Sequence, residues 1–72
     1  MNDEVRTLFA RLKSERIRQK KSQNDIAAAM GIDRSAVSKM EAGANISIAR
    51  TLEYAEILGC KIYIEYGNKA WL

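Results

Sequence analysis

The sequence contains no histidine, no proline and a single cysteine, Cys60, among its 72 residues. One cysteine excludes an intramolecular disulfide, and the missing histidine removes the most frequent general base and metal ligand. A chain of this length buries only about 60% of the surface that its unfolded form exposes, which leaves little volume for a cleft. We therefore expect one small domain, stabilised by a second copy, that is not an enzyme and has no catalytic residues, metal or cofactor.

Long hydrophobic runs are missing as well. The longest, Ile26 to Met30, has five residues, far fewer than the roughly 20 that a membrane-spanning helix needs. The N-terminal residues also lack the pattern of a signal peptide. These absences predict a cytoplasmic protein without a membrane partner.

The charge of the chain is unevenly distributed. Residues 6–21 hold seven basic residues and one acidic residue, Glu15, a net charge of +6, whereas the other residues together carry −3. Such a basic segment suits a polyanionic partner, although a solvated helix face would explain the same charges. The basic residues are Arg6, Arg11, Lys13, Arg16, Arg18, Lys20 and Lys21.

The spacing of apolar residues predicts four helices before residue 60. The first runs from about Asp3 to Lys20, and the others lie between an N-cap and a terminating glycine, over 22–31, 33–43 and 47–59. The N-caps are Ser22, Asp33 and Ser47, and Asp25 completes a capping box with Ser22. The predicted buried positions are Val5, Leu8, Phe9, Leu12, Ile26, Ala27, Met30, Val37, Met40, Ile48, Leu52, Ala55 and Leu58.

After Gly59 the pattern changes to strict alternation. One face of this segment would carry Cys60, Ile62, Ile64 and Tyr66, and the other Lys61, Tyr63 and Glu65. This alternation predicts a β-strand. A lone strand has unpaired backbone groups, so the nearest partner is the same strand of a second chain.

The second and third helices are joined by only three residues. Helices connected so closely cross steeply and need a small residue where their backbones approach. Ala27 supplies the small residue, Gly31 makes the turn, and Val37 fills the angle from the third helix. This spacing is typical of a DNA-binding helix-turn-helix.

The stretches LKSERIRQ, SQNDIAAAMGIDRSAVSKMEAG and SIARTLEYAEILG, between about Leu12 and Leu58, resemble the phage-repressor and Cro-like regulators, often called the XRE family. CKIYIEY is similar to the C-terminal dimerisation strand of HigA- and HipB-type antitoxins. The resemblance implies a mostly α, lambda-repressor-like fold, with a four-helix helix-turn-helix DNA-binding domain in residues 1–59. Residues 60–72 would form the dimerisation strand, which pairs across a homodimer, and a tail.

The resemblance also implies roles for single residues. Ser22 and Gln23 match positions that contact the DNA backbone. Arg16 and Glu41 match an ion pair that bridges the first and third helices. Two positions depart from the family pattern, because Lys20 stands where a glycine is usual and Lys21 where an apolar residue is usual. The positions that match the base-reading residues of the recognition helix are Arg34, Ser35, Ser38 and Lys39.

The residues themselves favour Arg34 as the principal base contact, because it lies in the first turn of the recognition helix and arginine binds guanine with two donors. Lys39 could read a base or hold a phosphate, and Ser35 and Ser38 are short, so either of these serines could be a phosphate contact. The basic cluster supplies the remaining predicted backbone contacts, which are Lys13, Arg18 and Lys21.

The strand pairing has a preferred register. An antiparallel pair centred on Tyr63 sets Lys61 opposite Glu65 of the other chain, twice, and Ile62 opposite Ile64. These five residues form the predicted dimer interface, and the apolar face of the ribbon would rest on the fourth helix.

These observations together predict a sequence-specific transcriptional regulator of double-stranded DNA, a repressor that binds a palindromic operator as a homodimer. The alternative is an antitoxin that neutralises a partner toxin by protein–protein contact and autoregulates its operon. It would use the acidic surface of Glu53 and Glu56 and the tail around Trp71.

Overall fold

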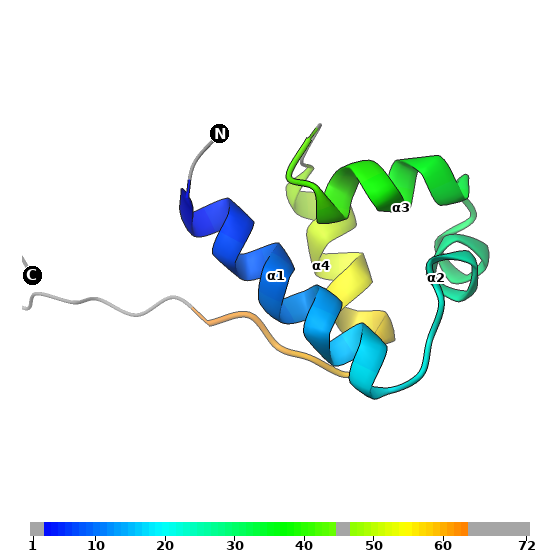
Figure 1. Cartoon of the computed structure of the whole chain (residues 1–72), viewed down its shortest axis with the longest axis horizontal. Helices are drawn as coiled ribbons and strands as arrows, with labels where there is room; N and C mark the ends of the chain where they lie inside the picture. The colour runs from blue at the N-terminus through cyan, green and yellow to red at the C-terminus, as the bar shows by residue number, and fades with distance from the viewer. Residues whose placement is uncertain (1–2, 45–46, 64–72) are drawn as a thin grey trace, which may run out of the picture.

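The computed structural model describes residues 3–44 and 47–63, with side chains from Arg6 onward. It contains four α-helices, which are α1 (Asp3–Arg18), α2 (Gln23–Met30), α3 (Arg34–Glu41) and α4 (Ile48–Ile57). In Figure 1, α2 is seen almost end-on while α3 lies across the view, so the two helices cross steeply. The prediction of a four-helix domain with a helix-turn-helix is confirmed. Within the described ranges no helix is long and apolar enough to cross a membrane.

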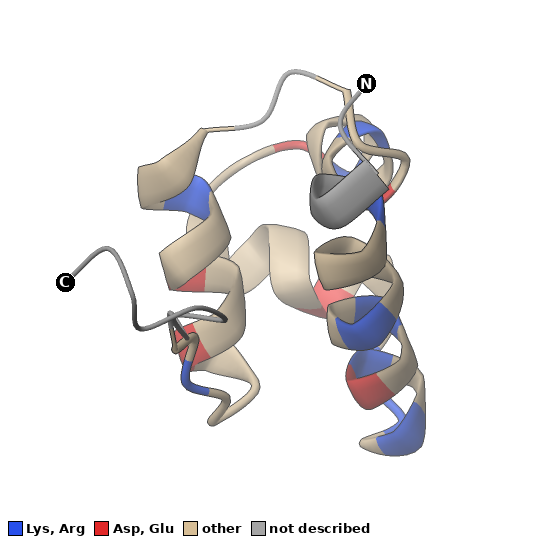
Figure 2. Ribbon diagram, turned by 90° about the vertical axis from the view of Figure 1, so that its left-hand side faces the viewer, with Lys and Arg blue, Asp and Glu red and all other residues tan. Residues whose placement is uncertain are grey.

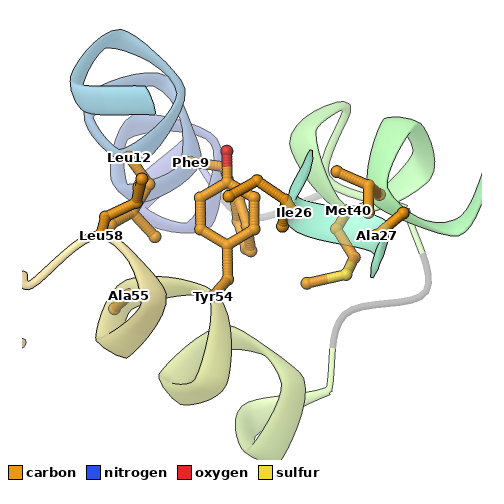
Figure 3. Close-up of a cluster of buried hydrophobic side chains, with 9 residues drawn as sticks. Phe9, Leu12, Ile26, Ala27, Met40, Tyr54, Ala55 and Leu58 are labelled. Carbon is orange, nitrogen blue, oxygen red and sulfur yellow. The ribbon is translucent and has the colours of Figure 1, made fainter. Parts of the chain in front are cut away.

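The helices enclose one apolar core, and each of them contributes to it. The ring of Tyr54 lies at its centre, between Phe9 of α1 and Ile26 of α2 (Figure 3). The Phe9 and Tyr54 rings meet edge to face, with their centroids 5.6 Å apart, a preferred geometry for aromatic pairs. The fully or largely buried apolar residues are Phe9, Leu12, Ile26, Ala27, Val37, Met40, Tyr54, Ala55 and Leu58.

The start and end of α2 follow the predicted chemistry. The Asp25 backbone N–H donates to Ser22 Oγ at 3.0 Å, and the Ser22 N–H donates to Asp25 Oδ2 at 2.8 Å, which forms the capping box. The backbone hydrogen bond from Ser22 lowers the pKa of Asp25. Gly31 then adopts φ 69°, the left-handed conformation that lets α3 leave at a steep angle.

The cap of α3 differs from the prediction. Asp33 occupies the N-cap position, but its side chain makes no capping hydrogen bond. Its exposed carboxylate instead lines a surface hollow together with Lys39 and Arg50.

The predicted buried stripe of α4 is wrong at two positions. Ile48 and Leu52 are 78% and 51% exposed, whereas Thr51 and Tyr54 are buried with Ala55 and Leu58. Both buried polar side chains have hydrogen-bond partners: Thr51 Oγ1 donates to the Ser47 carbonyl at 2.7 Å, and Tyr54 donates to Glu41. A satisfied polar group can be buried at little cost. The buried face of α4 is therefore turned about the helix axis, away from the face that its apolar residues alone predict.

The segment after α4 begins at the C-terminal end of that helix, where the Cys60 N–H donates to the Ala55 carbonyl at 2.9 Å. Cys60 to Tyr63 form one wall of a groove whose other wall includes Leu8 and Leu12 of α1. The packing of a paired ribbon on the fourth helix needs a second chain and stays a prediction. Residues 60–63 form no strand. The remaining predicted strand residues, Ile64, Glu65 and Tyr66, lie outside the described residues, as does the tail around Trp71.

The first helix ends two residues earlier than predicted. The N–H of Lys20 donates to the Ile17 carbonyl at 2.9 Å and that of Lys21 to the Arg16 carbonyl at 3.1 Å, the pattern of a Schellman motif. Lys20 has φ 60° and is the only described non-glycine residue with positive φ. Lysine therefore occupies a left-handed position that favours glycine, at the place where the resembling family usually has one.

We predict that Lys20→Gly stabilises the domain. Left-handed backbone costs a non-glycine residue about 1 kcal/mol or more, and relief of about 1 kcal/mol corresponds to a rise in Tm of about 4–8 °C for a domain of this size. Thermal denaturation followed by circular dichroism measures this change. As a matched control, Gly31→Ala should lower Tm, because Gly31 has φ 69°. Since no atom lies within 4 Å of an added Cβ, that loss would come from the backbone conformation and not from a clash. An unchanged or lower Tm for Lys20→Gly would contradict the strain.

Candidate nucleic-acid interface

One face of α3 is buried and the opposite face is polar. Val37 and Met40 are 0% and 2% exposed and anchor the helix in the core. The four predicted base-reading residues, Arg34, Ser35, Ser38 and Lys39, are all exposed. The structure thus places them together on the solvent side of a helix that is fixed from behind.

The C-terminal end of α3 is held by the carboxylate of Glu41. Arg16 of α1 donates to it through Nε at 2.7 Å and Nη2 at 3.2 Å, so the structure forms the predicted pair. Tyr54 of α4 donates through its hydroxyl at 2.6 Å, and Gln23 of α2 through Nε2 at 3.0 Å. The side chains of Arg16 and Glu41 are only 9% and 3% exposed.

Burial and hydrogen bonding act in opposite directions on these groups. Burial raises the pKa of Glu41, but the hydrogen bonds from Arg16, Tyr54 and Gln23 outweigh it and hold that pKa below the usual glutamate range. Burial, and then the bond to Glu41, raises the pKa of Tyr54. The bond to Glu41 also raises the pKa of Arg16. Glu41 and Arg16 are therefore charged, and Tyr54 is neutral, at neutral pH.

The network continues from Glu41 to the exposed polar face of α3. Gln23 donates to Glu41 through Nε2, and its Oε1 accepts a hydrogen bond from Arg34 Nη1 at 3.3 Å. The amide of Gln23 thereby links the buried carboxylate to the exposed arginine. Arg34 consequently has a preferred direction although its side chain lies in solvent.

Ser22 stands next to Gln23 at the start of α2 and is exposed. Its hydroxyl oxygen accepts the capping bond from Asp25. A hydroxyl can accept and donate at the same time, so the cap leaves the hydroxyl proton of Ser22 available to a phosphate oxygen.

The basic residues of α1 divide between two sides of the helix. Figure 2 shows Lys and Arg spread along α1. Arg16 contacts α3 through Glu41, and Lys13, about one turn earlier, lies on a neighbouring part of the helix surface. Arg11 and Arg18, seven residues apart, share a different side and line a shallow hollow there. Helical spacing thus places Lys13, but not Arg18, on the side towards α3.

Two predicted backbone contacts have partners within the chain. Arg18 pairs with Glu15, and the hydrogen bonds from Arg18 and then Gln19 lower the pKa of Glu15 to about 2. The ammonium of Lys21 donates to the Ile57 carbonyl at 3.2 Å, at the C-terminal end of α4, where the helix dipole favours a cation. A phosphate contact by Lys21 would have to break this bond.

Two residues of this region were missed by the sequence reasoning. Tyr54 lies outside the apolar pattern predicted for α4, although its hydroxyl holds Glu41. Arg50 was not singled out, yet it lines the same hollow as Lys39 of α3. Its position in the first turn of α4, directly after the helix-turn-helix, is a signal that could have identified it. Over the described ranges no group of three or more His, Cys, Asp or Glu side chains is placed to hold a metal ion.

An exposed polar helix, braced by a steeply crossing second helix, is the geometry of a helix-turn-helix DNA-binding domain. A family model described as helix-turn-helix matches residues 12–64 of the chain. The chain belongs to the XRE-type helix-turn-helix family and is a DNA-binding transcriptional regulator whose partner is double-stranded DNA. No curated protein and no solved structure gives a significant match.

The Glu41 network gives a stability prediction. Glu41→Gln keeps the size of the side chain but leaves the buried Arg16 without a counter-charge. We expect the free energy of unfolding, measured with urea, to fall by about 3–5 kcal/mol. As a control, Glu15→Gln removes a carboxylate of the same type from an exposed pair and should change stability little.

The same pair of proteins, wild type and Glu41→Gln, tests the direction of the pKa shift. Because the folded-state pKa of Glu41 is lowered, its contribution is complete above the pKa of the unfolded chain, about 4.3. It is lost as the pH falls through the lower folded-state value. The stability difference between the two proteins should therefore shrink in acid, and a difference that grows on acidification would contradict the assignment.

Proposed function

We propose that the chain is a repressor that binds a palindromic operator as a homodimer. The observation that carries the proposal is the connection from the buried Glu41 through Gln23 to the exposed Arg34. Groups that are already held in position lose less conformational entropy on binding. A reading arginine fixed in this way is suited to a defined base rather than to any nearby phosphate.

The proposal of a two-fold complex follows from the size of the reading helix. The eight residues of α3 reach only a few base pairs. Two copies that enter successive major grooves, about 34 Å apart, double the number of contacts and read a palindrome. A dimer on its operator would repress by occupying DNA that the polymerase needs.

Substitution of Arg34 tests the reading surface. We expect Arg34→Ala to weaken operator binding by about 1–3 kcal/mol per half-site and to relax the preference at one base pair in each half-site. Gln23→Ala should weaken binding to all sequences through the lost backbone contact, and it should also relax the preference at the Arg34 base pair, less than Arg34→Ala does, because Gln23 orients Arg34. Since the two side chains are hydrogen-bonded, a double-mutant cycle should also give a coupling of about 0.5–3 kcal/mol.

Binding-site selection with fluorescence-anisotropy titration measures these effects. Arg34→Lys is the matched control, because it keeps the charge but loses the two parallel donors of arginine. It should lose base preference while it retains most of the non-specific affinity. If Arg34→Ala selects the same sequences as the wild type, Arg34 is not the base-reading residue.

Charge reversal tests the predicted dimer interface. Lys61 and Tyr63 are exposed in the single chain and are thus accessible to a partner. In the register centred on Tyr63, Lys61→Glu faces Glu65 of the other chain, and like charges placed opposite each other are unfavourable. We expect this variant to dimerise poorly in sedimentation experiments and to recover when Glu65→Lys is added. A double variant that stays monomeric would exclude this register. A tight dimer formed by a chain without residues 60–72 would place the dimer interface elsewhere.

The antitoxin function is a second candidate, favoured by a surface of α4 that the reading helix does not use. Leu52, Glu53 and Glu56 are all exposed on α4. An apolar side chain beside two carboxylates suits a partner protein with a basic rim around an apolar pocket. Such a partner could bind while α3 remains free for DNA, so the two functions are compatible.

A further inference from the structure

We propose that Lys39 and Arg50 together hold one phosphate of the DNA backbone, so that Lys39 positions the recognition helix rather than reading a base. This inference rests on the proposed operator binding. It assigns a role to Arg50 and decides between the two roles that the sequence leaves open for Lys39.

The site is a hollow of about 290 Å³ between α3 and the start of α4. Ser35 and Lys39 line it from α3, Arg50 lines it from α4, and Met40 contributes an apolar wall. The side chains of Lys39 and Arg50 are exposed, and neither makes a hydrogen bond or ion pair with another described residue. Two cations from different helices thus border one open space without a partner of their own.

The position of the hollow on α3 indicates which part of the DNA it meets. Arg34 and Glu41 lie on the edge of α3 that contacts Gln23 of α2. Ser35 and Lys39, four residues apart, lie on the other edge, which faces α4. A helix in the major groove has a sugar–phosphate backbone on each side. With Gln23 beside one backbone, the edge with Lys39 and Arg50 lies beside the other.

The electrostatics of the hollow suit an anion. Asp33 also lines it, so the two cations and one carboxylate leave an excess of one positive charge. Arg50 belongs to the first turn of α4, where the helix dipole adds partial positive charge. The hydroxyl of Ser35 supplies a further donor. A phosphate, with one negative charge and several acceptor oxygens, fits this set better than a base edge does.

The test combines three measurements on the full chain, which are ethylation interference on an operator duplex, salt titration and binding-site selection. For the wild type, ethylation of one phosphate in each half-site should abolish binding because it blocks this contact. In Lys39→Gln and Arg50→Gln, affinity should fall for all sequences alike, the preferred sequence should stay the same, and ethylation of that phosphate should no longer interfere. The slope of log K against log salt should become shallower by about 0.9 for each half-site.

A double variant and one charge-preserving variant test whether both cations hold the same phosphate. Because both cations hold the same phosphate, Lys39→Gln combined with Arg50→Gln should lose less affinity than the two single losses multiplied together. Arg50→Lys should keep the wild-type salt slope and interference pattern. Since both side chains are exposed, every variant should retain the thermal stability of the wild type.

Each contrary result overturns a defined part of the inference. A changed base preference in Lys39→Gln would make Lys39 a base-reading residue. An unchanged salt slope and interference pattern in Arg50→Gln would remove Arg50 from the interface. Loss of interference at two different phosphates would exclude a shared site. If the wild type itself binds no duplex, the proposed function fails, which is a different outcome from a wild type that binds without this contact.

Discussion

The carboxylate of Glu41 joins all four helices. It belongs to α3 and accepts hydrogen bonds from Arg16 of α1, Gln23 of α2 and Tyr54 of α4. A buried ion pair contributes little net stability, but a buried charge without partners is costly. Among the described residues, no buried side-chain nitrogen or oxygen lacks a partner. We therefore infer that Glu41 selects one relative placement of the helices, because other placements would leave its charge unsatisfied.

The same carboxylate connects stability to recognition. Gln23 is the first residue of α2, and its amide reaches both the buried Glu41 and the exposed Arg34. An exposed arginine normally samples many rotamers, and fixing them on binding costs free energy. Here part of that cost is met when the domain folds. The helix-turn-helix thus orients the side chain that we propose reads a base, as well as the helix that carries it.

Sequence reasoning predicted this architecture where the signal was local. The spacing of Ala27, Gly31 and Val37 and the capping box of Ser22 depend on residues close together in the chain, and the structure shows both. The burial of Tyr54 in place of Leu52 depends on a hydrogen bond to Glu41, thirteen residues away. Apolar periodicity contains no information about such a partner. The predicted α4 stripe was therefore wrong at Ile48 and Leu52, although Ala55 and Leu58 are buried and the helix itself was right.

The basic residues show why composition alone could not define the interface. A net charge of +6 over residues 6–21 indicates a polyanion partner, but it treats every lysine and arginine alike. The structure distinguishes them by their surroundings. Arg18 is paired with Glu15, and Lys21 holds the C-terminal end of α4. Arg50, from the less basic part of the chain, borders an open hollow next to the recognition helix. Affinity for DNA depends on the cations that remain unpaired beside the reading surface, and that set follows from the fold.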